Sequence, residues 1–201
     1  QSAPVIAALN TGNAVVAWSS QNQDGSQEGV YARIVKPDGT FPTNAFRVNQ
    51  TTRFNQKSPA VATLTNGNFV VVWVAENQGL SLVQLADMGV PGRVDIYGRL
   101  FDSSGAALGG EFKINTTNHF CSDPDVSGTA EGGFSVVWAQ KELSSTNSMD
   151  IYLRNFRAEG TAVSLSARVN SFTYGDQFQP KISRLDQNQM VVWTSKGQDG
   201  S

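Results

Sequence analysis

The sequence has little of the chemistry on which many binding and catalytic sites depend. A single cysteine excludes a disulfide framework and a cysteine-built metal cluster, and a single histidine excludes a zinc site built from histidines. With 15 Lys and Arg against 17 Asp and Glu, the chain offers no basic surface to a nucleic acid. Its apolar runs, such as the one that begins at Phe69, are far shorter than the ~20 residues needed to cross a bilayer. We therefore predict no nucleic-acid partner and no membrane span.

What the chain does contain is an internal repeat. Its 201 residues are 39% hydrophobic and 16% charged, which is typical of a folded rather than a disordered chain. The four tryptophans stand 55, 65 and 55 residues apart, and each closes a short apolar run that is rich in valine. These tryptophans are Trp18, Trp73, Trp138 and Trp193. A repeat of this length indicates stacked supersecondary units that complete one another's core.

Further landmarks recur around each tryptophan. A proline precedes it by 14, 14, 14 and 13 positions, at Pro4, Pro59, Pro124 and Pro180. In the first three units a Tyr-x-Arg element follows it, as in Tyr31-Ala-Arg33, and then a string that ends in asparagine, as in Phe46-Arg-Val-Asn49. So many landmarks at nearly constant spacing indicate a structural repeat rather than an accident of composition.

Each unit is predicted to form four short strands. The first strand follows the proline, the second is the valine-rich run that ends at the tryptophan, the third carries Tyr-x-Arg, and the fourth carries Arg-Val-Asn or its equivalent. Asn/Gly pairs such as Asn66-Gly67 predict tight hairpins between strands. The valine-rich run lacks alternation, which is typical of a strand covered on both faces. Residues 79–88 are the nearest approach to a helical pattern, and we interpret them as an inserted loop with at most one helical turn.

The fold class that follows is all-β, with β-propeller-type blades of four antiparallel strands, three complete units and a partial fourth. The predicted units are residues 4–58, 59–123, 124–179 and the partial unit 180–201. We expect the four tryptophans to form the structural core between blades. A β-sandwich or a β-solenoid could use the same strands.

The number of units is itself informative, because propellers close with about four to eight blades. A half unit would leave an unpaired apolar strand edge, which invites pairing with another chain. This pattern predicts either a fragment of a longer chain or copies that associate through their sheet edges.

The Val-Val-Trp, Gln-Asp-Gly-Ser, Tyr-x-Arg and Arg-Val-Asn strings together resemble a known tandem repeat. It occurs in long secreted or surface proteins of bacteria, some of which carry RTX-type calcium-binding segments, and of ciliates. The resemblance covers nearly the whole chain. It implies an extracellular, secreted or cell-surface setting and a propeller-like array, and it implies no catalytic residues. The second unit departs from the pattern, because Glu76-Asn-Gln-Gly79 lacks the Asp-Gly-Ser string.

The Tyr/Arg pairs are the candidate ligand-binding residues. They are Tyr31 and Arg33, Tyr97 and Arg99, and Tyr152 and Arg154. Such pairs could bind sugars by aromatic stacking and bidentate hydrogen bonds. They could equally be structural, with each arginine bridging to the next blade and each tyrosine packed between sheets.

Three further sets of residues could carry chemistry. Asp24 and Asp199, in Gln-Asp-Gly-Ser loops, could bind calcium, although one carboxylate in each loop is few for such a site. Asp95 and Asp150 could form the carboxylate pair of a glycosidase, but residues that repeat from blade to blade stand at equivalent places rather than around one substrate. His119 and Cys121 could form a nucleophilic pair only within hydrogen-bond reach of each other.

The sequence as a whole predicts a non-enzymatic extracellular module with no catalytic residues and no required cofactor. Its expected roles are adhesion, surface structure, or the binding of glycans or surface proteins. One alternative is a structural surface protein that self-associates through its sheet edges. The other is a propeller-type polysaccharide hydrolase or lyase.

Overall fold

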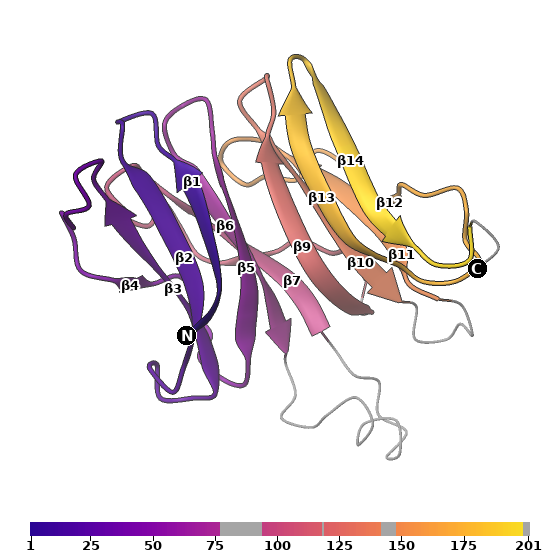
Figure 1. The fold of residues 1–201 in the computed structure, drawn as a ribbon, viewed down its shortest axis with the longest axis horizontal. Helices are drawn as coiled ribbons and strands as arrows, with labels where there is room; N and C mark the ends of the chain where they lie inside the picture. Colours follow the sequence, from indigo (N-terminus) through magenta and orange to yellow (C-terminus); the bar gives the residue numbers. More distant parts are fainter. Residues whose placement is uncertain (77–93, 118, 142–147, 199–201) are drawn as a thin grey trace.

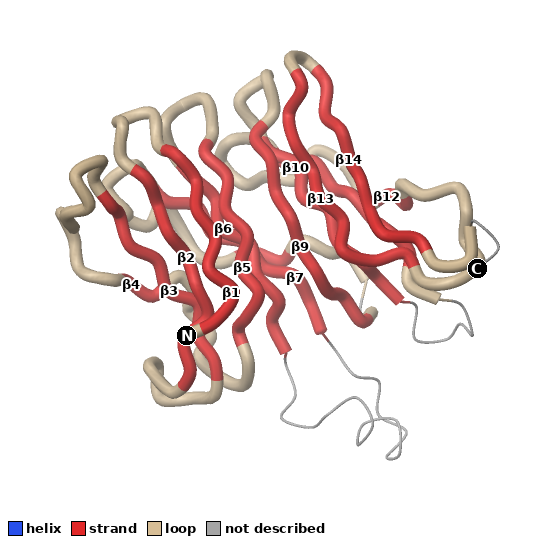
Figure 2. The backbone as a smooth tube through the Cα atoms, viewed as in Figure 1, coloured by secondary structure: helices blue, strands red, loops and turns tan. Residues whose placement is uncertain are grey.

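The computed structural model describes residues 1–76, 94–117, 119–141 and 148–198, and in these ranges every regular element is a β-strand (Figures 1 and 2). The strands are β1 (Ser2–Ala8), β2 (Ala14–Gln21), β3 (Glu28–Val35), β4 (Phe46–Arg47), β5 (Gln56–Thr63), β6 (Phe69–Glu76), β7 (Val94–Phe101), β8 (Phe112–Lys113), β9 (Phe120–Gly128), β10 (Phe134–Lys141), β11 (Asp150–Phe156), β12 (Ala167–Arg168), β13 (Gln177–Leu185) and β14 (Asn188–Ser195). In the described part of the chain, no helix has the length and apolar character needed to cross a membrane. The helical turn considered for residues 79–88 lies outside the described residues.

Consecutive strands pair in antiparallel order and form blades. Blade 1 is β1–β4, blade 2 is β5–β8, blade 3 is β9–β12, and blade 4 contributes β13 and β14. A single parallel bridge between Val94 and Phe120 links blades 2 and 3. The predicted all-β fold of propeller-type blades, with three complete blades and a partial fourth, is confirmed.

The blades stand side by side, with their first strands β1, β5, β9 and β13 following one another across the molecule (Figure 1). We call these four strands the inner strands. The later strands of each blade lie progressively farther from them, as the pairing order of β1 to β4 shows for blade 1. Features of the four inner strands are therefore brought together, whereas equivalent features of the outer strands are kept apart.

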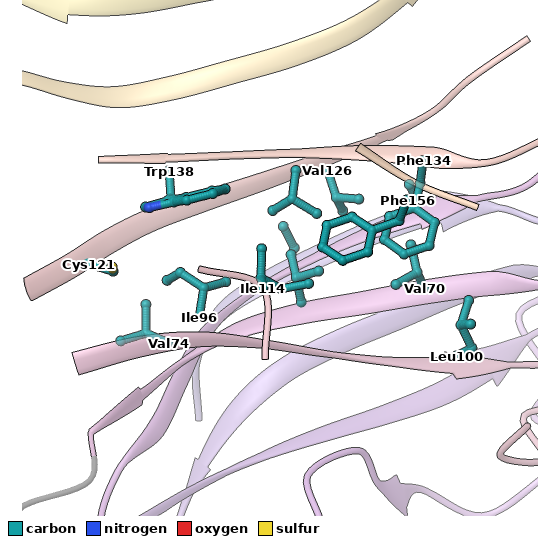
Figure 3. Close-up of a cluster of buried hydrophobic side chains, with 14 of the residues drawn as sticks. Val70, Val74, Ile96, Leu100, Ile114, Cys121, Val126, Phe134, Trp138 and Phe156 are labelled. Atoms are coloured by element: carbon teal, nitrogen blue, oxygen red, sulfur yellow. The ribbon is translucent and has the colours of Figure 1, made fainter. Parts of the chain in front are cut away.

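The core lies between the blades, not within them. One apolar cluster joins blades 1 and 2, and a second joins blades 2 and 3 (Figure 3). Strand β6 serves both clusters, because Phe69, Val71 and Trp73 face blade 1 while Val70, Val72 and Val74 face blade 3. The run of valines without alternation thus results from a two-residue period in which both faces are buried.

The tryptophans differ in burial according to their place in the array. Trp73 and Trp138 are fully buried between neighbouring blades, each on the face toward the preceding blade. Trp18 is half-buried, because it lies on the face of β2 that is turned away from blade 2. Trp193 is half-buried on β14, where intermediate and exposed residues alternate.

This difference leads to a prediction about stability. Trp73→Ala should lower the free energy of unfolding by about 3–5 kcal/mol, the range for removal of a fully buried aromatic side chain. Trp193→Ala should lower it by clearly less, because its indole is only half-buried. Urea unfolding followed by circular dichroism measures both changes, and equal losses would contradict a core located between the blades.

Candidate functional site

Each inner strand contains a β-bulge opposite the tryptophan of its neighbouring strand. In blade 3, Ser122 pairs with Ala139 and Asp125 pairs with Val137, so that two residues stand opposite Trp138 alone. The same register shift occurs opposite Trp18, Trp73 and Trp193. Two residues against one is the defining geometry of a bulge. The repeated Pro-to-Trp spacing of the sequence is therefore the signature of this bulge.

The first residue of every bulge has a left-handed backbone. The φ angles are 49° for Ala3, 51° for Ser58, 50° for Asp123 and 52° for Gln179, each directly before the repeated proline. None of these residues is glycine, the residue that adopts positive φ without steric conflict. A left-handed non-glycine residue costs about 1–2 kcal/mol, and such strain is concentrated at functional sites. The chain accepts this strain four times at one equivalent position.

The four bulges converge on a single groove. It has a volume of about 400 Å³ and combines residues of all four inner strands with Thr194 of β14. Its walls are Ala3, Ser58, Pro59, Asp123, Pro124, Gln179, Pro180, Lys181 and Thr194. We call this the axial groove. The bulge thus positions one variable residue from each blade in the axial groove.

The carboxylates of β9 are the charged centre of this region. Asp123 is exposed in the axial groove, and its Oδ2 accepts a hydrogen bond from the Ser122 hydroxyl at 3.0 Å. Asp125 is turned toward β13, where its Oδ2 accepts the Ile182 N–H at 2.9 Å and its Oδ1 lies 3.6 Å from the Lys181 ammonium. The second carboxylate therefore holds Lys181 of the groove wall against blade 3.

A larger hollow of about 620 Å³ lies at the other end of β9, where hairpin turns of blades 3 and 4 meet. Its charged residues, Glu131, Arg157 and Glu159, are all exposed turn residues. It draws on two blades only, and the strained bulges have no part in it. The axial groove is the better candidate for a functional site because the four strained bulges build it.

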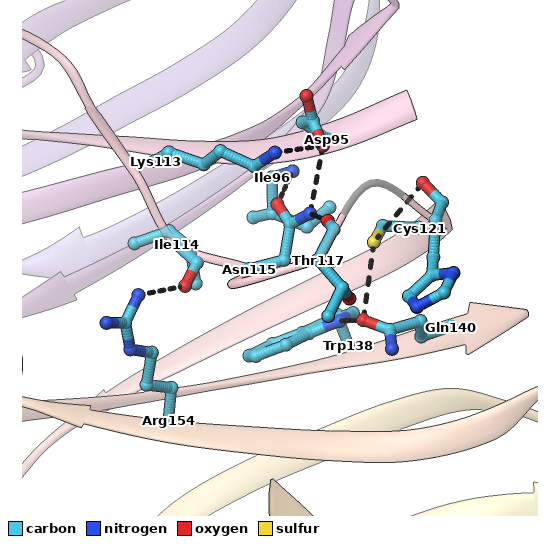
Figure 4. A network of polar contacts seen from close by, with 11 residues as sticks. Asp95, Ile96, Lys113, Ile114, Asn115, Thr117, Cys121, Trp138, Gln140 and Arg154 are labelled. Atoms are coloured by element: carbon cyan, nitrogen blue, oxygen red, sulfur yellow. Dashed lines mark hydrogen bonds and ion pairs between the residues drawn. The ribbon is translucent and has the colours of Figure 1, made fainter. Parts of the chain in front are cut away.

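The asparagines that end the Arg-Val-Asn strings form a buried polar node in each complete blade, and Figure 4 shows the node of blade 2. In blade 2, the Asn115 side chain accepts the Ile96 N–H at 2.8 Å and donates to Asp95 at 2.9 Å and to the Thr117 carbonyl at 2.6 Å. Lys113 pairs with the same Asp95 at 2.8 Å. Asn49 and Asn170 make equivalent bonds. This node closes the fourth strand onto the third.

Asp95 and Asp150 are consequently engaged in separate nodes of blades 2 and 3. Asp95 is buried beside Asn115, and Asp150 accepts from Asn170 at 2.7 Å. The structure does not bring the two carboxylates together around a common groove. Their repetition reflects a structural role, as the reasoning from equivalent positions indicated.

In blade 1 the carboxylate of the node comes from a different segment. Gly29 stands where the other blades have aspartate, and Asp24 of the preceding loop reaches the Asn49 amide at 3.3 Å. A β-carbon placed on Gly29 would lie 2.6 Å from Asp24 Oδ2, so that only glycine leaves room for this carboxylate. Asp24 is thus occupied in the node. Asp199, the other calcium candidate, lies outside the described residues, and no group of three or more potential metal ligands occurs among the described ones.

Two of the three arginines of the Tyr-x-Arg elements connect neighbouring blades. Arg99 donates through Nη1 to the Val48 carbonyl of blade 1 at 3.0 Å, and Arg154 donates to the Ile114 carbonyl of blade 2 at 2.7 Å. Burial lowers the pKa of both guanidinium groups. Arg33 donates to the Thr43 carbonyl and lies over the Phe41 ring. None of the three lines the axial groove.

The tyrosines pack beside the tryptophans on the paired strands. The rings of Tyr97 and Trp73 are 6.4 Å apart, and those of Tyr152 and Trp138 are 6.2 Å apart. Tyr31 is buried, and its burial together with nearby Asp24 raises its pKa. Ligand binding by the Tyr/Arg pairs stays a prediction.

His119 and Cys121 do not form a catalytic pair. The Cys121 thiol is fully buried, and its contacts are the His119 backbone carbonyl at 3.9 Å and the Gln140 side chain at 3.7 Å (Figure 4). Burial raises the pKa of this thiol far above its ordinary range, which disfavours the nucleophilic thiolate. Gln140 also accepts the Trp138 indole N–H at 3.1 Å. Cys121 therefore packs the interface of blades 2 and 3.

Comparisons with known proteins support the fold. Neither a known family profile nor a curated protein sequence matches the chain. Among solved structures, an α-L-arabinofuranosidase from Lactobacillus brevis matches 98% of this chain with a TM-score of 0.64 and 12% identity, over 63% of its own length. A Hadza microbial sialidase matches 96% with a TM-score of 0.70 and 9% identity, over 42% of its length. An endo-arabinase from Bacteroides thetaiotaomicron matches 96% with a TM-score of 0.59 and 14% identity, over 70% of its length. The chain spans less than two thirds of the length of the arabinofuranosidase and of the sialidase.

These matches require a correction. The sequence predicted a non-enzymatic extracellular module, but several of the solved structures that match carry glycosidase names, among them arabinofuranosidases, an arabinanase and a family-43 glycoside hydrolase. The prediction of a chain without enzymatic function is therefore wrong by this comparison. It failed because the residue sets weighed for carbohydrate chemistry, the Tyr/Arg pairs and the Asp95/Asp150 pair, were repeated ones. Asp123, which has no acidic counterpart in the other blades, was missed, although its place before Pro124 was visible in the sequence.

The bulge geometry generates a prediction about backbone strain. Ser58→Gly should raise the free energy of unfolding by about 0.5–1 kcal/mol relative to Ser58→Ala, because glycine adopts positive φ without conflict. Chemical denaturation of the two variants measures the difference. Equal stability would mean that the left-handed bulge is not strained.

The burial of Cys121 generates a prediction about reactivity. The native protein should react with a thiol reagent at pH 8 at less than about a hundredth of the rate of the unfolded chain, because attack requires an exposed thiolate. Absorbance of the released thiol product, with and without denaturant, gives both rates. Rapid reaction of the native protein would show that this thiol is accessible.

Proposed function

We propose that this chain belongs to a carbohydrate-active β-propeller that hydrolyses glycosidic bonds in the axial groove. Asp123 carries the proposal. Of the four equivalent left-handed positions that line the groove, only this one bears a carboxylate. The glycosidase names of the matching structures support this function for the fold.

Divergence at the bulge position supports a functional role for it. The bulge proline is the same in all four blades, and the node asparagine is the same in the three complete ones. Such residues maintain an architecture that every blade shares. The residue before the proline differs in every blade, as Ala3, Ser58, Asp123 and Gln179. The side chain at this position varies while the strained backbone is retained. We therefore assign this position to the functional site that the four blades form together.

Glycoside hydrolysis uses two carboxyl groups separated by about 5–9.5 Å, one to protonate the leaving oxygen and one as nucleophile or base. Asp123 is the substrate-facing member. The second carboxyl that we assign is Asp125, whose Cα lies at most about 7 Å from that of Asp123 because it is two residues farther along β9. Asp125 does not line the axial groove itself but lies beside Lys181 of its wall. Asp125 accepts a hydrogen bond from the Ile182 N–H at 2.9 Å, and its Oδ1 lies 3.6 Å from the Lys181 ammonium.

In this proposal, the Asp123 carboxylate takes up a proton from solvent and donates it to the glycosidic oxygen as the bond to the anomeric carbon breaks. A water molecule adds to that carbon and gives its proton to Asp125. Two free sugar hydroxyl groups result, and proton exchange with solvent restores both carboxyl groups. Hydrolysis thus needs no reactant other than water. An extracellular setting, as the repeat resemblance implies, is part of the same proposal.

The test compares Asp123→Asn with the wild-type chain on p-nitrophenyl α-L-arabinofuranoside, linear arabinan and a sialyl glycoside. The variant should lose about 10²- to 10⁴-fold in kcat, the contribution of a positioned acid or base. Release of p-nitrophenol, reducing sugar or free sialic acid measures turnover.

Glu159→Gln is the matched control, because it removes an exposed carboxylate outside the axial groove. It should hydrolyse substrate like the wild type. Absence of turnover in the wild-type chain, or full activity of Asp123→Asn, would overturn the proposed function.

A further inference from the structure

The two bulge residues on either side of Asp123 have polar side chains that the protein itself does not use. Ser58 comes from the inner strand before β9 and Gln179 from the one after it, and both line the axial groove. Within the described part of the chain, neither the Ser58 hydroxyl nor the Gln179 amide forms a hydrogen bond to another protein group. They are free to bind a ligand.

Their backbone is nevertheless firmly held. The Ser58 N–H donates to the hydroxyl of Ser19, a buried residue of blade 1, at 3.1 Å. Next to Gln179, the buried Pro180 continues the strand, and the Ile182 N–H is bonded to Asp125 of blade 3. An unpaired polar side chain on a firmly held backbone suits recognition, because the backbone loses little conformational freedom when a ligand binds.

The charges of the groove indicate the kind of ligand. Asp123 is its one carboxylate among the described residues, and Lys181 is paired with Asp125. Ser58, Gln179 and Thr194 are neutral groups that donate and accept hydrogen bonds. An acidic sugar would bring a second negative charge to Asp123, whereas a neutral sugar would meet complementary groups.

We infer that Ser58 and Gln179 are specificity-determining residues that bind hydroxyl groups of a neutral sugar on either side of Asp123. The inference rests on the proposed function for its site and extends it to the class of substrate. Recognition of neutral pentose or hexose units then depends on these two side chains, and uronic or sialic acid units are rejected by the carboxylate between them.

Binding without turnover provides the first test. Titration calorimetry on the folded chain with arabinotriose and with xylotriose should show binding of at least one of them. Trigalacturonic acid and 3′-sialyllactose should bind at least about tenfold more weakly, as expected for a like charge brought to Asp123. Equal or tighter binding of the acidic sugars would overturn the inference.

Side-chain variants provide the second test. Gln179→Leu and Ser58→Ala should each weaken binding of the neutral trisaccharide about 5- to 20-fold, the usual effect of removing one hydrogen-bonding group. Gln187→Leu is the matched control, because Gln187 is an exposed glutamine of the β13–β14 turn outside the groove. Unchanged affinity in both groove variants would overturn the inference.

The readouts separate the two proposals. If the chain hydrolyses substrate, Gln179→Leu should raise KM and leave kcat within about threefold, because it removes an interaction that is equally strong in the ground state and the transition state. Asp123→Asn should lower kcat, because it removes an interaction made only in the transition state. Neutral sugars that bind through Ser58 and Gln179 but are not hydrolysed would overturn the hydrolase and support the recognition site. Hydrolysis that is unchanged by Gln179→Leu and by Ser58→Ala would overturn the recognition site and support the hydrolase.

Discussion

The structure depends on the burial of one blade's face against the next. Strand β6 shows this most directly, since its odd and even residues fill two different interfaces. The free energy that holds a blade therefore comes largely from its neighbours, at roughly 25 cal/mol for each Å² of apolar surface removed from water. The arginine bonds to the carbonyl groups of Val48 and Ile114 fix the register of these interfaces.

The same arrangement explains how a strained bulge can persist. The bulge lies opposite a tryptophan, and between the central blades that indole is completely buried. The backbone cannot relax without opening the most extensively packed region of the interface. Stability supplied by the blade faces is thus used at the inner strands to hold side chains in a conformation they would not adopt alone.

Much of the fold could be predicted from the sequence, and much of the site could not. The valine runs, the tryptophans and the Asn/Gly turns report local periodicity, which is sufficient to identify strands and blades. The two-residue length of β4, β8 and β12 could not be seen, because the node asparagine completes these strands by side-chain bonds. To predict the axial groove from the sequence, one would need to know which strand of each blade is innermost. One would also need to know that a bulge turns its residue toward the neighbouring blades. A search among repeated residues leads to Asp95 and Asp150, whereas the functional candidate Asp123 has no repeated counterpart.

Blade 1 shows that the units are not interchangeable cassettes. Gly29 and Asp24 together replace an aspartate that blades 2 and 3 carry on the strand itself, so that the amide of Asn49 still meets a carboxylate. Either change alone is unfavourable, since loss of Asp24 leaves Asn49 without a carboxylate acceptor, and an aspartate in place of Gly29 crowds two acids into one space. When blades of such an array diverge after duplication, substitutions at positions like 24 and 29 must therefore occur in pairs. Each blade then accumulates paired substitutions that its neighbours lack.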